Sequence, residues 1–167
     1  LEIEPGADIA DQQWCEQRLR EVLGDSIVGE NDQTLAEVLV AELSSRAKKL
    51  TVAESCTGGL IASAITRVSG ASAVFEAGFV SYSNAIKHSV LGVSLSSLED
   101  YGAVSEPVVL EMLSGALAKS SADYGIAVSG VAGPEGGSME KPVGTVWIAW
   151  GSTVSYTHLR AHETRRY

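Results

Sequence analysis

The residues best suited to chemistry lie between Glu54 and Gly59, where a short apolar run gives way to a serine, a cysteine, a threonine and two glycines. If the run is a strand and a helix follows, Ser55 is a nucleophile in the connecting turn. Gly58 and Gly59 would then let backbone N–H groups approach a ligand. The alternative is an ordinary strand-to-helix turn in which Ser55 or Thr57 only caps the helix. Such turns are common, so this stretch taken alone favours the alternative.

A serine nucleophile needs a base, and the usual base is histidine. Of the three histidines, only His88 lies in the body of the chain, and we expect it to be a surface helix residue. Lysine is the other candidate, because burial can lower its pKa enough to leave some neutral amine. Lys87 has apolar neighbours that favour such burial, and a solvated helix lysine is the alternative.

Three further side chains could support or replace this pair. Tyr82 ends a predicted strand, where it can relay a proton, hold the lysine or only pack half-buried. Cys56 is the rival nucleophile because a helix N-terminus lowers a thiol pKa, although a small thiol after a strand is commonly just buried. Glu54 either orients the lysine or is a satisfied structural carboxylate, and the sequence does not separate these two roles.

A second glycine-rich segment reads GVAGPEGG over residues 130–137. Its backbone can cradle a phosphate or another ligand, and the alternative is an ordinary crossover loop. No G-K-[ST] ending follows, so the segment is not a P-loop and ATP use is not indicated. No His or Cys cluster suggests zinc, and we expect neither a metal nor a cofactor.

These segments follow predicted strands in an alternating pattern. We expect strands over residues 50–53, 75–82, 124–129 and 143–150. We expect helices over residues 33–48, 59–68, 84–91, 95–101 and from 105 through at least 117. The alternation predicts an α/β fold, a layered α/β/α domain with a mainly parallel or mixed sheet. Ligands bind outside the carboxyl ends of such strands, so the turns at 56–59, 83–87 and 130–137 should converge.

Two local signals refine the predicted helices. Thr34 and Glu37 have the spacing of a capping box, which marks the start of the helix over 33–48. Gly115 lies inside the helix that begins at 105, where it costs stability and suggests close helix packing. Residues 11–23 form a further amphipathic helix closed by a glycine, and a polar, turn-rich linker follows it.

Composition bounds the function. The 167 residues are 45% hydrophobic and 20% charged, which suits one ordinary globular domain with an extra segment. The net charge of −9 and the lack of a basic patch make nucleic acid a poor partner. There is no signal-like start and no apolar run of about 18 residues, which argues against secretion and membrane spanning. Cys15 and Cys56 form no disulfide framework, so we expect a reduced, cytoplasmic setting.

Five motifs occur in order: AESCTGG at 53–59, YSNAIK at 82–87, GAVSE at 102–106, GVAGPEGG at 130–137 and KPVGTV at 141–146. Together they closely resemble the C-terminal domain of the CinA (competence/damage-inducible protein) family. That family includes nicotinamide-nucleotide amidases of pyridine-nucleotide salvage. The resemblance implies hydrolysis of the carboxamide of nicotinamide mononucleotide to nicotinate mononucleotide and ammonia.

The resemblance also implies roles for individual residues. Ser55 is the nucleophile, Lys87 its base and Tyr82 a supporting proton relay, while N–H groups near residues 57–59 stabilise the oxyanion. The substrate is a small nucleotide, no metal takes part, and the protein is a homodimer. We expect substrate contacts at Thr57, Gly58, Gly59, Gly130, Ala132, Gly133, Gly136 and Gly137.

Both ends of the chain depart from this domain. Residues 1–30 resemble the end of the middle region of long CinA proteins, and we transfer neither the metal nor the ADP-ribose hydrolysis of their N-terminal half. Residues 154–167 match no family segment, so we expect a non-native tail after a truncated domain at 31–153. The chain begins at Leu1, and we expect a fragment of a longer protein. The alternative function is a non-catalytic, nucleotide-binding or regulatory module.

Overall fold

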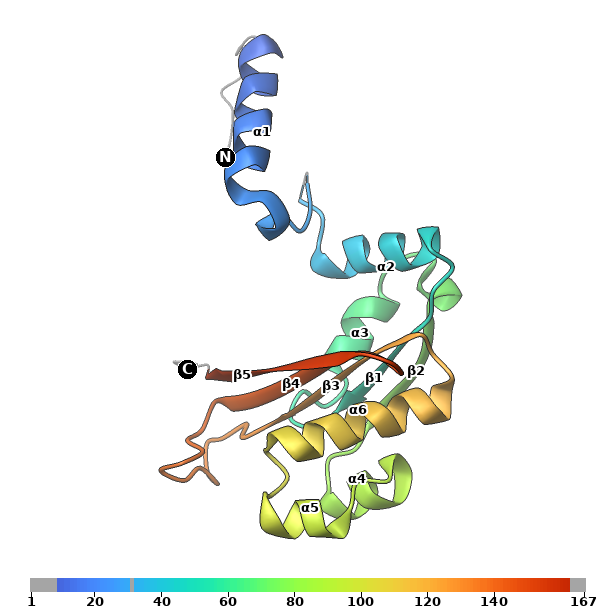
Figure 1. Cartoon of the computed structure of the whole chain (residues 1–167), viewed down its shortest axis with the longest axis vertical. Coiled ribbons are helices and arrows are strands. Elements are labelled where there is room, and N and C mark those ends of the chain that lie inside the picture. Colours follow the sequence, from blue (N-terminus) through green and yellow to red (C-terminus); the bar gives the residue numbers. More distant parts are fainter. Residues whose placement is uncertain (1–8, 31, 163–167) are drawn as a thin grey trace. The chain divides into compact units, whose positions relative to one another are not determined.

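A computed structural model describes residues 9–30 and 32–162 (Figure 1). The chain forms two compact units, Leu1–Val38 and Leu39–Tyr167. The domain limits drawn from the sequence, at residues 30 and 153, remain predictions. Within the described ranges, no helix is long and apolar enough to cross a membrane.

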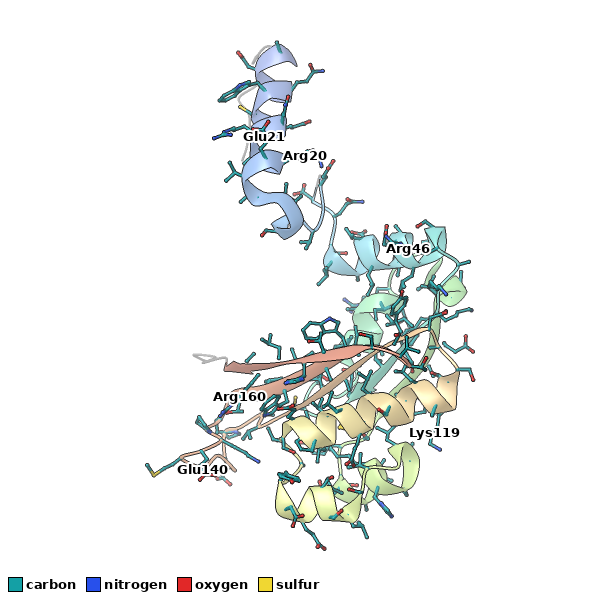
Figure 2. The ribbon with its side chains drawn as sticks, viewed as in Figure 1. Arg20, Glu21, Arg46, Lys119, Glu140 and Arg160 are labelled. Carbon is teal, nitrogen blue, oxygen red and sulfur yellow. The ribbon has the colours of Figure 1, made fainter. Side chains whose placement is uncertain are left out.

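The first unit begins with helix α1 (Ile9–Leu23), which ends where a 3₁₀ turn (Gly24–Ser26) begins. This confirms the amphipathic helix predicted over residues 11–23. Arg20, near the end of α1 (Figure 2), forms an ion pair with Glu30 in the segment that follows the helix. The polar linker is therefore tied to the last turn of the helix within this unit.

Helix α2 (Leu35–Ser45) starts with the predicted capping box. The Glu37 N–H donates to Thr34 Oγ1 (3.3 Å), and the Thr34 N–H donates to the Glu37 carboxylate (2.7 Å). These hydrogen bonds lower the pKa of Glu37, because the backbone and side chain of Thr34 stabilise its charged form. The residues that define the motif in sequence thus make both of its reciprocal bonds.

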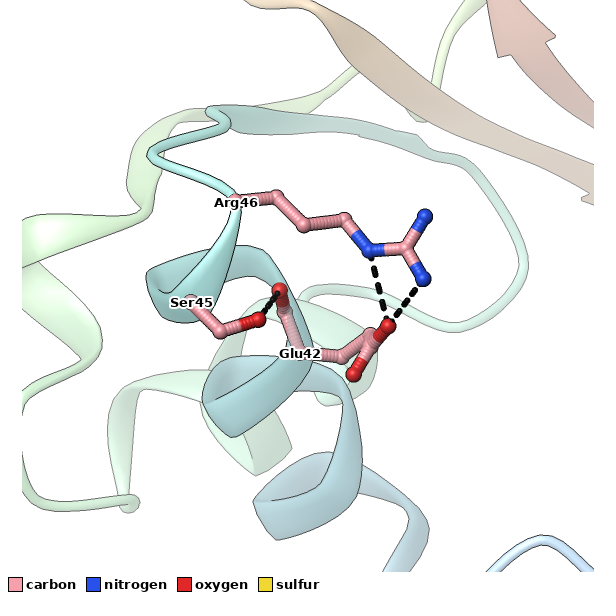
Figure 3. Close-up of polar contacts among 3 residues, drawn as sticks. All are labelled: Glu42, Ser45 and Arg46. Carbon is pink, nitrogen blue, oxygen red and sulfur yellow. Dashed lines mark hydrogen bonds and ion pairs between the residues drawn. The ribbon is translucent and has the colours of Figure 1, made fainter.

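The other end of α2 is at Ser45, rather than near residue 48 as predicted. Ala47 adopts a left-handed conformation (φ 50°), which ends the helix. Polar side chains close the last turn (Figure 3): Arg46 Nε donates to Glu42 Oε1 (2.7 Å), and Ser45 Oγ donates to the Glu42 carbonyl (2.8 Å). Lys48 therefore lies beyond the helix.

The second unit is built on a mixed sheet. Its described strands are β1 (Leu50–Glu54), β2 (Phe75–Val80), β3 (Tyr124–Gly130), β4 (Thr145–Ser152) and β5 (Tyr156–His162). Their order in the sheet is β2-β1-β3-β4-β5. Strands β2, β1 and β3 are parallel, while β4 and β5 join antiparallel. The predicted α/β fold with a mixed sheet is confirmed, and β5 was not predicted as a strand.

Helices cover both faces of this sheet (Figure 1). On one face lie α4 (Asn84–Leu91), α5 (Leu95–Asp100) and α6 (Glu106–Ser120). On the other face lie α3 (Leu60–Thr66) and the second half of α2. Each face of the sheet packs into its own apolar core, and β1 contributes side chains to both. Ala53 lies in the core formed with α6, and Val52 lies in the core formed with α3. Successive side chains of a strand point to opposite faces, so β1 is buried on both sides.

Helices α4 and α6 pack closely at Gly115. A Cβ added there would lie 1.8 Å from the Leu91 carbonyl oxygen of α4. No other residue fits at this separation without moving one helix, so the close packing suggested by this glycine in the sequence is observed. The contact fixes α4, and with it the lysine that α4 carries toward the sheet.

Candidate active site

The carboxyl ends of three parallel strands meet at one edge of the sheet. The Ser55 N–H, just after β1, donates to the Val128 carbonyl of β3 (3.0 Å). The Ser81 N–H, just after β2, donates to the Glu54 carbonyl (2.8 Å). These bonds continue the sheet past the strand ends. The turns that follow β1 and β2 are therefore held side by side, as the sequence predicts.

Ser55 and Lys87 meet at this edge. Ala53 faces the core shared with α6, so Ser55, two residues further along β1, points to the same face. Helix α4 starts at Ser83, whose Oγ accepts the Ile86 N–H (3.2 Å), and Lys87 lies one turn in. Its Nζ is 2.8 Å from Ser55 Oγ. The structure therefore brings together the two residues predicted as nucleophile and base.

Lys87 is held by two backbone carbonyls as well. Its Nζ donates to the Ser81 carbonyl (2.8 Å) and to the Tyr82 carbonyl (3.2 Å). The lysine is 1% exposed and Ser55 is 7% exposed. Burial lowers the pKa of Lys87 below its ordinary value of 10.5, and a smaller interaction with Cys56 acts in the opposite direction.

The contacts of Lys87 accommodate a neutral amine as well as an ammonium ion, whose three N–H groups would donate to Ser55 Oγ and the two carbonyls. A neutral amine has two N–H donors and one lone pair, whereas an ammonium ion has three donors and no lone pair. The carbonyls of Ser81 and Tyr82 can take the two N–H groups. In the ammonium form Nζ donates to Ser55 Oγ, whereas in the neutral form, which burial favours, the lone pair faces Ser55 and the hydroxyl donates to it. This arrangement can remove a proton from Ser55.

The sequence left open whether Glu54 orients Lys87 or is a structural carboxylate. In the structure its role is the structural one. Its carboxylate points to the opposite face from Ser55 and accepts the N–H groups of Gly59 (3.1 Å), Ile61 (3.1 Å) and Ala62 (2.8 Å). It has no hydrogen bond to Lys87 among the described contacts. The carboxylate one residue before the candidate nucleophile thus caps α3. If the turn were only structural, the sequence suggested Ser55 or Thr57 for this capping role.

In the turn after Ser55, the N–H groups of the two glycines were expected to face a ligand, and the structure shows a different arrangement. The Gly58 N–H donates to the Ser55 carbonyl (3.1 Å), and the Gly59 N–H donates to Glu54. These two N–H groups are occupied within the protein, so they do not face a ligand as expected. Thr57 Oγ1, by contrast, is buried and has no hydrogen-bond partner among the described residues.

Tyr82 approaches Lys87 through its backbone rather than its side chain. Its carbonyl accepts from Nζ, while the side chain is 71% exposed. The phenol hydroxyl has no hydrogen bond among the described residues. The structure therefore does not bring the predicted proton-relay group to the lysine.

Cys56 and His88 are less favourable as a nucleophile and a base. Burial raises the pKa of the Cys56 thiol, and this outweighs the opposing effects of its own N–H, Lys87 and the Thr57 N–H. The thiol is therefore protonated near neutral pH. His88 is exposed on α4, and its Nδ1 lies 2.8 Å from the Val93 carbonyl. The prediction that His88 is a surface residue is confirmed.

The second glycine-rich segment begins beside the Ser55 turn. A Cβ on Gly130 would lie 3.0 Å from Cys56 Sγ, so the end of β3 lies against that turn. Farther on, the loop is anchored elsewhere: Lys141 Nζ donates to the Tyr101 carbonyl (2.5 Å), and Arg160 of β5 donates to the Glu140 carbonyl (2.9 Å; Figure 2). In the described contacts, the remaining loop residues predicted to bind substrate have no hydrogen bond to Ser55 or Lys87: Ala132, Gly133, Gly136 and Gly137.

Comparison with known proteins decides the family. Residues 32–166 match the family described as the CinA C-terminal domain. The chain belongs to this family. This confirms the family to which the five sequence motifs were assigned.

Relatives of the CinA domain include both long and short proteins. A CinA-like protein of Colwellia psychrerythraea is 56% identical over 138 residues, which are 81% of this chain and 32% of that protein. The nicotinamide-nucleotide amidohydrolase PncC of Enterobacter agglomerans is 61% identical over 110 residues, 66% of this chain and 67% of that protein. The PncC of Escherichia coli K12 is 53% identical over 118 residues, 71% and 72% of the two chains. The chain thus spans 32% of the long relative and about two thirds of the short ones.

Solved structures agree with this fold. A CinA superfamily protein from Escherichia coli has a TM-score of 0.76 and 37% identity, with 86% of each chain covered. A competence/damage inducible protein from Agrobacterium tumefaciens has a TM-score of 0.75 and 43% identity, covering 76% of this chain and 78% of that one. The CinA fold therefore extends over most of this chain.

Some contacts of this CinA domain had no signal in the sequence. The carbonyls of Ser81 and Tyr82 hold Lys87, and a backbone carbonyl leaves no trace in residue type. No metal-binding group of three or more His, Cys, Asp or Glu residues occurs within residues 9–30 and 32–162. The site described by the structure is thus a serine and a lysine held by backbone groups.

Proposed function

We propose that this chain is a nicotinamide-nucleotide amidohydrolase, which converts nicotinamide mononucleotide and water to nicotinate mononucleotide and ammonia. The observation that carries the proposal is the 2.8 Å hydrogen bond between Lys87 Nζ and Ser55 Oγ at a buried position. Two relatives named for this activity, at 61% and 53% identity, support the choice of substrate.

The first half of the reaction transfers the acyl group to Ser55. Neutral Lys87 takes the hydroxyl proton, and Ser55 Oγ bonds to the carboxamide carbon, whose oxygen becomes an oxyanion. When this intermediate collapses, the C–N bond breaks and protonated Lys87 gives its proton to the leaving nitrogen. Ammonia departs, and an ester to Ser55 remains.

The second half uses the same groups on water. Lys87, neutral again, takes a proton from a water molecule as its oxygen attacks the ester carbon. The bond to Ser55 Oγ then breaks, and the proton on Lys87 returns to Ser55. The carbonyls of Ser81 and Tyr82 keep Nζ in place through both halves. A proton relay through the Tyr82 hydroxyl would require its side chain to turn from solvent toward Lys87.

The substrate lies, in this proposal, between the Ser55 turn and the start of the glycine-rich loop at Gly130. Thr57 offers a buried hydroxyl without a partner in the described residues, which suits a polar group of the substrate. The phosphate is proposed to contact the loop over residues 130–137. The other glycines of that loop are proposed to contact the substrate, as the sequence predicts.

The setting is proposed from composition and resemblance. Both cysteines are free, which fits a reducing cytoplasm. The homodimer implied by the resemblance is expected to appear at twice the chain mass in sedimentation equilibrium. A monomer over the whole concentration range would contradict it.

The test of the function is the release of ammonia from nicotinamide mononucleotide. We expect turnover by the wild-type chain and a loss of at least about a thousandfold in Ser55→Ala, because the nucleophile is removed. Full activity of Ser55→Ala would remove Ser55 from the mechanism. Tight nucleotide binding without ammonia release would instead support a non-catalytic, nucleotide-binding module.

A further inference from the structure

The turn that carries Ser55 uses most of its backbone N–H groups internally. The Ser55 N–H donates to Val128, the Gly58 N–H to the Ser55 carbonyl and the Leu60 N–H to the Thr57 carbonyl (3.1 Å). Each bond ties one part of the turn to the sheet or to the turn itself. Only the remaining N–H groups of the turn are therefore available to a ligand.

The carboxylate of Glu54 accepts three further N–H groups at the start of α3. Its Oε2 accepts from Gly59 and Ile61, and its Oε1 accepts from Ala62. The carboxylate is 1% exposed, and charge-assisted hydrogen bonds of this kind are stronger than neutral ones. The start of α3 is thus closed by a side chain of the protein, and no N–H group of its first turn is left for an anion.

Two N–H groups of the turn, those of Cys56 and Thr57, have no oxygen acceptor among the described contacts and interact instead with the Cys56 sulfur. They directly follow Ser55. Their hydrogen bonds to this sulfur, a weak acceptor, lower its pKa against the larger effect of burial, so a stronger acceptor such as an oxyanion can compete for both N–H groups. In hydrolases with a nucleophile on a strand-to-helix turn, the N–H after the nucleophile is an oxyanion donor.

We propose that Glu54 is a positioning residue for catalysis. By binding the N–H groups of Gly59, Ile61 and Ala62, it fixes the turn so that the N–H groups of Cys56 and Thr57 converge on the oxyanion of the substrate. The inference rests on the proposed function, and it replaces the glycine N–H groups expected from the sequence. Glu54 itself touches neither substrate nor Lys87.

The role predicts a particular kinetic defect. Glu54→Gln keeps the size of the side chain but replaces one acceptor oxygen by an NH₂ group, which faces an N–H donor. The turn then loses part of its anchor, and the two oxyanion donors lose their alignment. Oxyanion contacts form only as the reaction proceeds, so kcat falls while KM changes little.

A matched control is available in Glu111 of α6. Its carboxylate accepts the Ser94 N–H (2.6 Å) and the Ser97 hydroxyl (2.6 Å), so it anchors the start of α5 as Glu54 anchors the start of α3. Among the described contacts, it has no hydrogen bond or ion pair with the Ser55 turn. Glu111→Gln therefore removes a comparable structural bond without disturbing the oxyanion donors.

The first experiment compares these two variants on nicotinamide mononucleotide. We expect Glu54→Gln to lower kcat by roughly a hundredfold, the scale of one lost oxyanion donor, with KM within about twofold. Glu111→Gln should lower the melting temperature similarly and keep kcat within about twofold. Equal kcat values for the two variants would overturn the role of Glu54, as would a defect of Glu54→Gln confined to KM.

The second experiment reads the oxyanion donors without turnover. Pyridine-3-boronic acid can form a tetrahedral adduct with Ser55, and its boron-bound oxygen mimics the oxyanion. In amide NMR spectra of the wild-type chain, we expect the largest downfield proton shifts at Cys56 and Thr57. The largest shifts at Gly58 or Gly59 would overturn the inference while leaving the amidase proposal intact. A wild-type chain that releases no ammonia and forms no adduct would reject both.

Discussion

At the scale of single residues, Lys87 is defined by what surrounds it. It is buried against two carbonyls and a hydroxyl, while the nearby carboxylate of Glu54 is committed to α3. A buried ammonium ion without a carboxylate partner is unfavourable, which favours the neutral amine. The same burial that would be a cost to folding thus supplies the base that Ser55 needs.

This environment predicts how stability depends on pH. Between the lowered pKa of Lys87 and its ordinary value of 10.5, the unfolded chain binds a proton that the folded chain does not. The free energy of unfolding should therefore rise with pH across that window. Lys87→Met, which keeps the volume without the charge, should lack this contribution in urea denaturation at a series of pH values. Identical slopes in the two proteins would contradict a depressed pKa.

Activity should depend on pH in the same sense. Only neutral Lys87 accepts the proton of Ser55, so kcat/KM should rise as pH rises through a value below 10.5. The profile is measured as ammonia release from nicotinamide mononucleotide at low substrate concentration. A rate that falls over this range would point to a base other than Lys87.

The sequence predicted the paired residues better than the residues that hold them. Ser55 and Lys87 stand in motifs whose order resembles the CinA family, and alternation along β1 explains why Ser55 faces α4. The carbonyl of Ser81 could not be predicted, because it becomes an acceptor only through the fold. The direction of the Glu54 side chain, which the sequence does not show, decides between its two possible roles. Tyr82 contacts Lys87 through its backbone carbonyl, whereas its side-chain hydroxyl was expected to do so.

At the scale of elements, the position of Lys87 depends on how α4 packs against α6. Gly115 makes that approach possible, since its missing Cβ leaves room for the Leu91 carbonyl. Alanine at an ordinary helix position is more stable than glycine by roughly 0.5–1 kcal/mol. Here that preference must be reversed, because the added methyl group would overlap the backbone of α4.

Gly115→Ala is therefore expected to destabilise the protein by about 2–3 kcal/mol, the scale of an overpacked core. It should also reduce ammonia release, because α4 carries the lysine. Ser114→Ala, at the exposed neighbouring position of α6, is the control and should leave the unfolding free energy within about 0.5 kcal/mol. Equal stability of the two variants, measured in urea, would show that the helices can separate at no cost.

The elements themselves were largely predictable from periodicity, and the misses have local causes. Helix α4 matches the predicted range, since Ser83 caps it and Gly92 follows its last residue. Helix α2 ends early because of the left-handed Ala47, and Lys48 beyond it pairs with Asp123 (2.7 Å) rather than with the helix end. Strand β5 lies in residues 154–167, which were expected to be a non-native tail, so its pairing with β4 was not predicted.

At the scale of the whole molecule, the candidate site depends on one of the two units. Ser55, Lys87 and both apolar cores lie in Leu39–Tyr167. The sheet unit should therefore keep its stability and its site when the preceding segment is removed.

Deletion of residues 1–30 tests this independence. It retains the capping box of Thr34 and Glu37, and we expect the melting temperature to change by less than about 4 °C, the shift that ~1 kcal/mol causes at this size. Ammonia release should stay within about twofold of the full chain. A large loss of either would show that residues 1–30 support the sheet unit.

The most direct test of the central claim is to identify the acylated atom. Acid quench during turnover of nicotinamide mononucleotide, followed by peptide mass spectrometry, should find the acyl group as an ester on Ser55. Cys56→Ala should give the same ester, and Lys87→Met should give none. An acyl group on Cys56, or full turnover by Lys87→Met, would contradict a mechanism in which Lys87 activates Ser55.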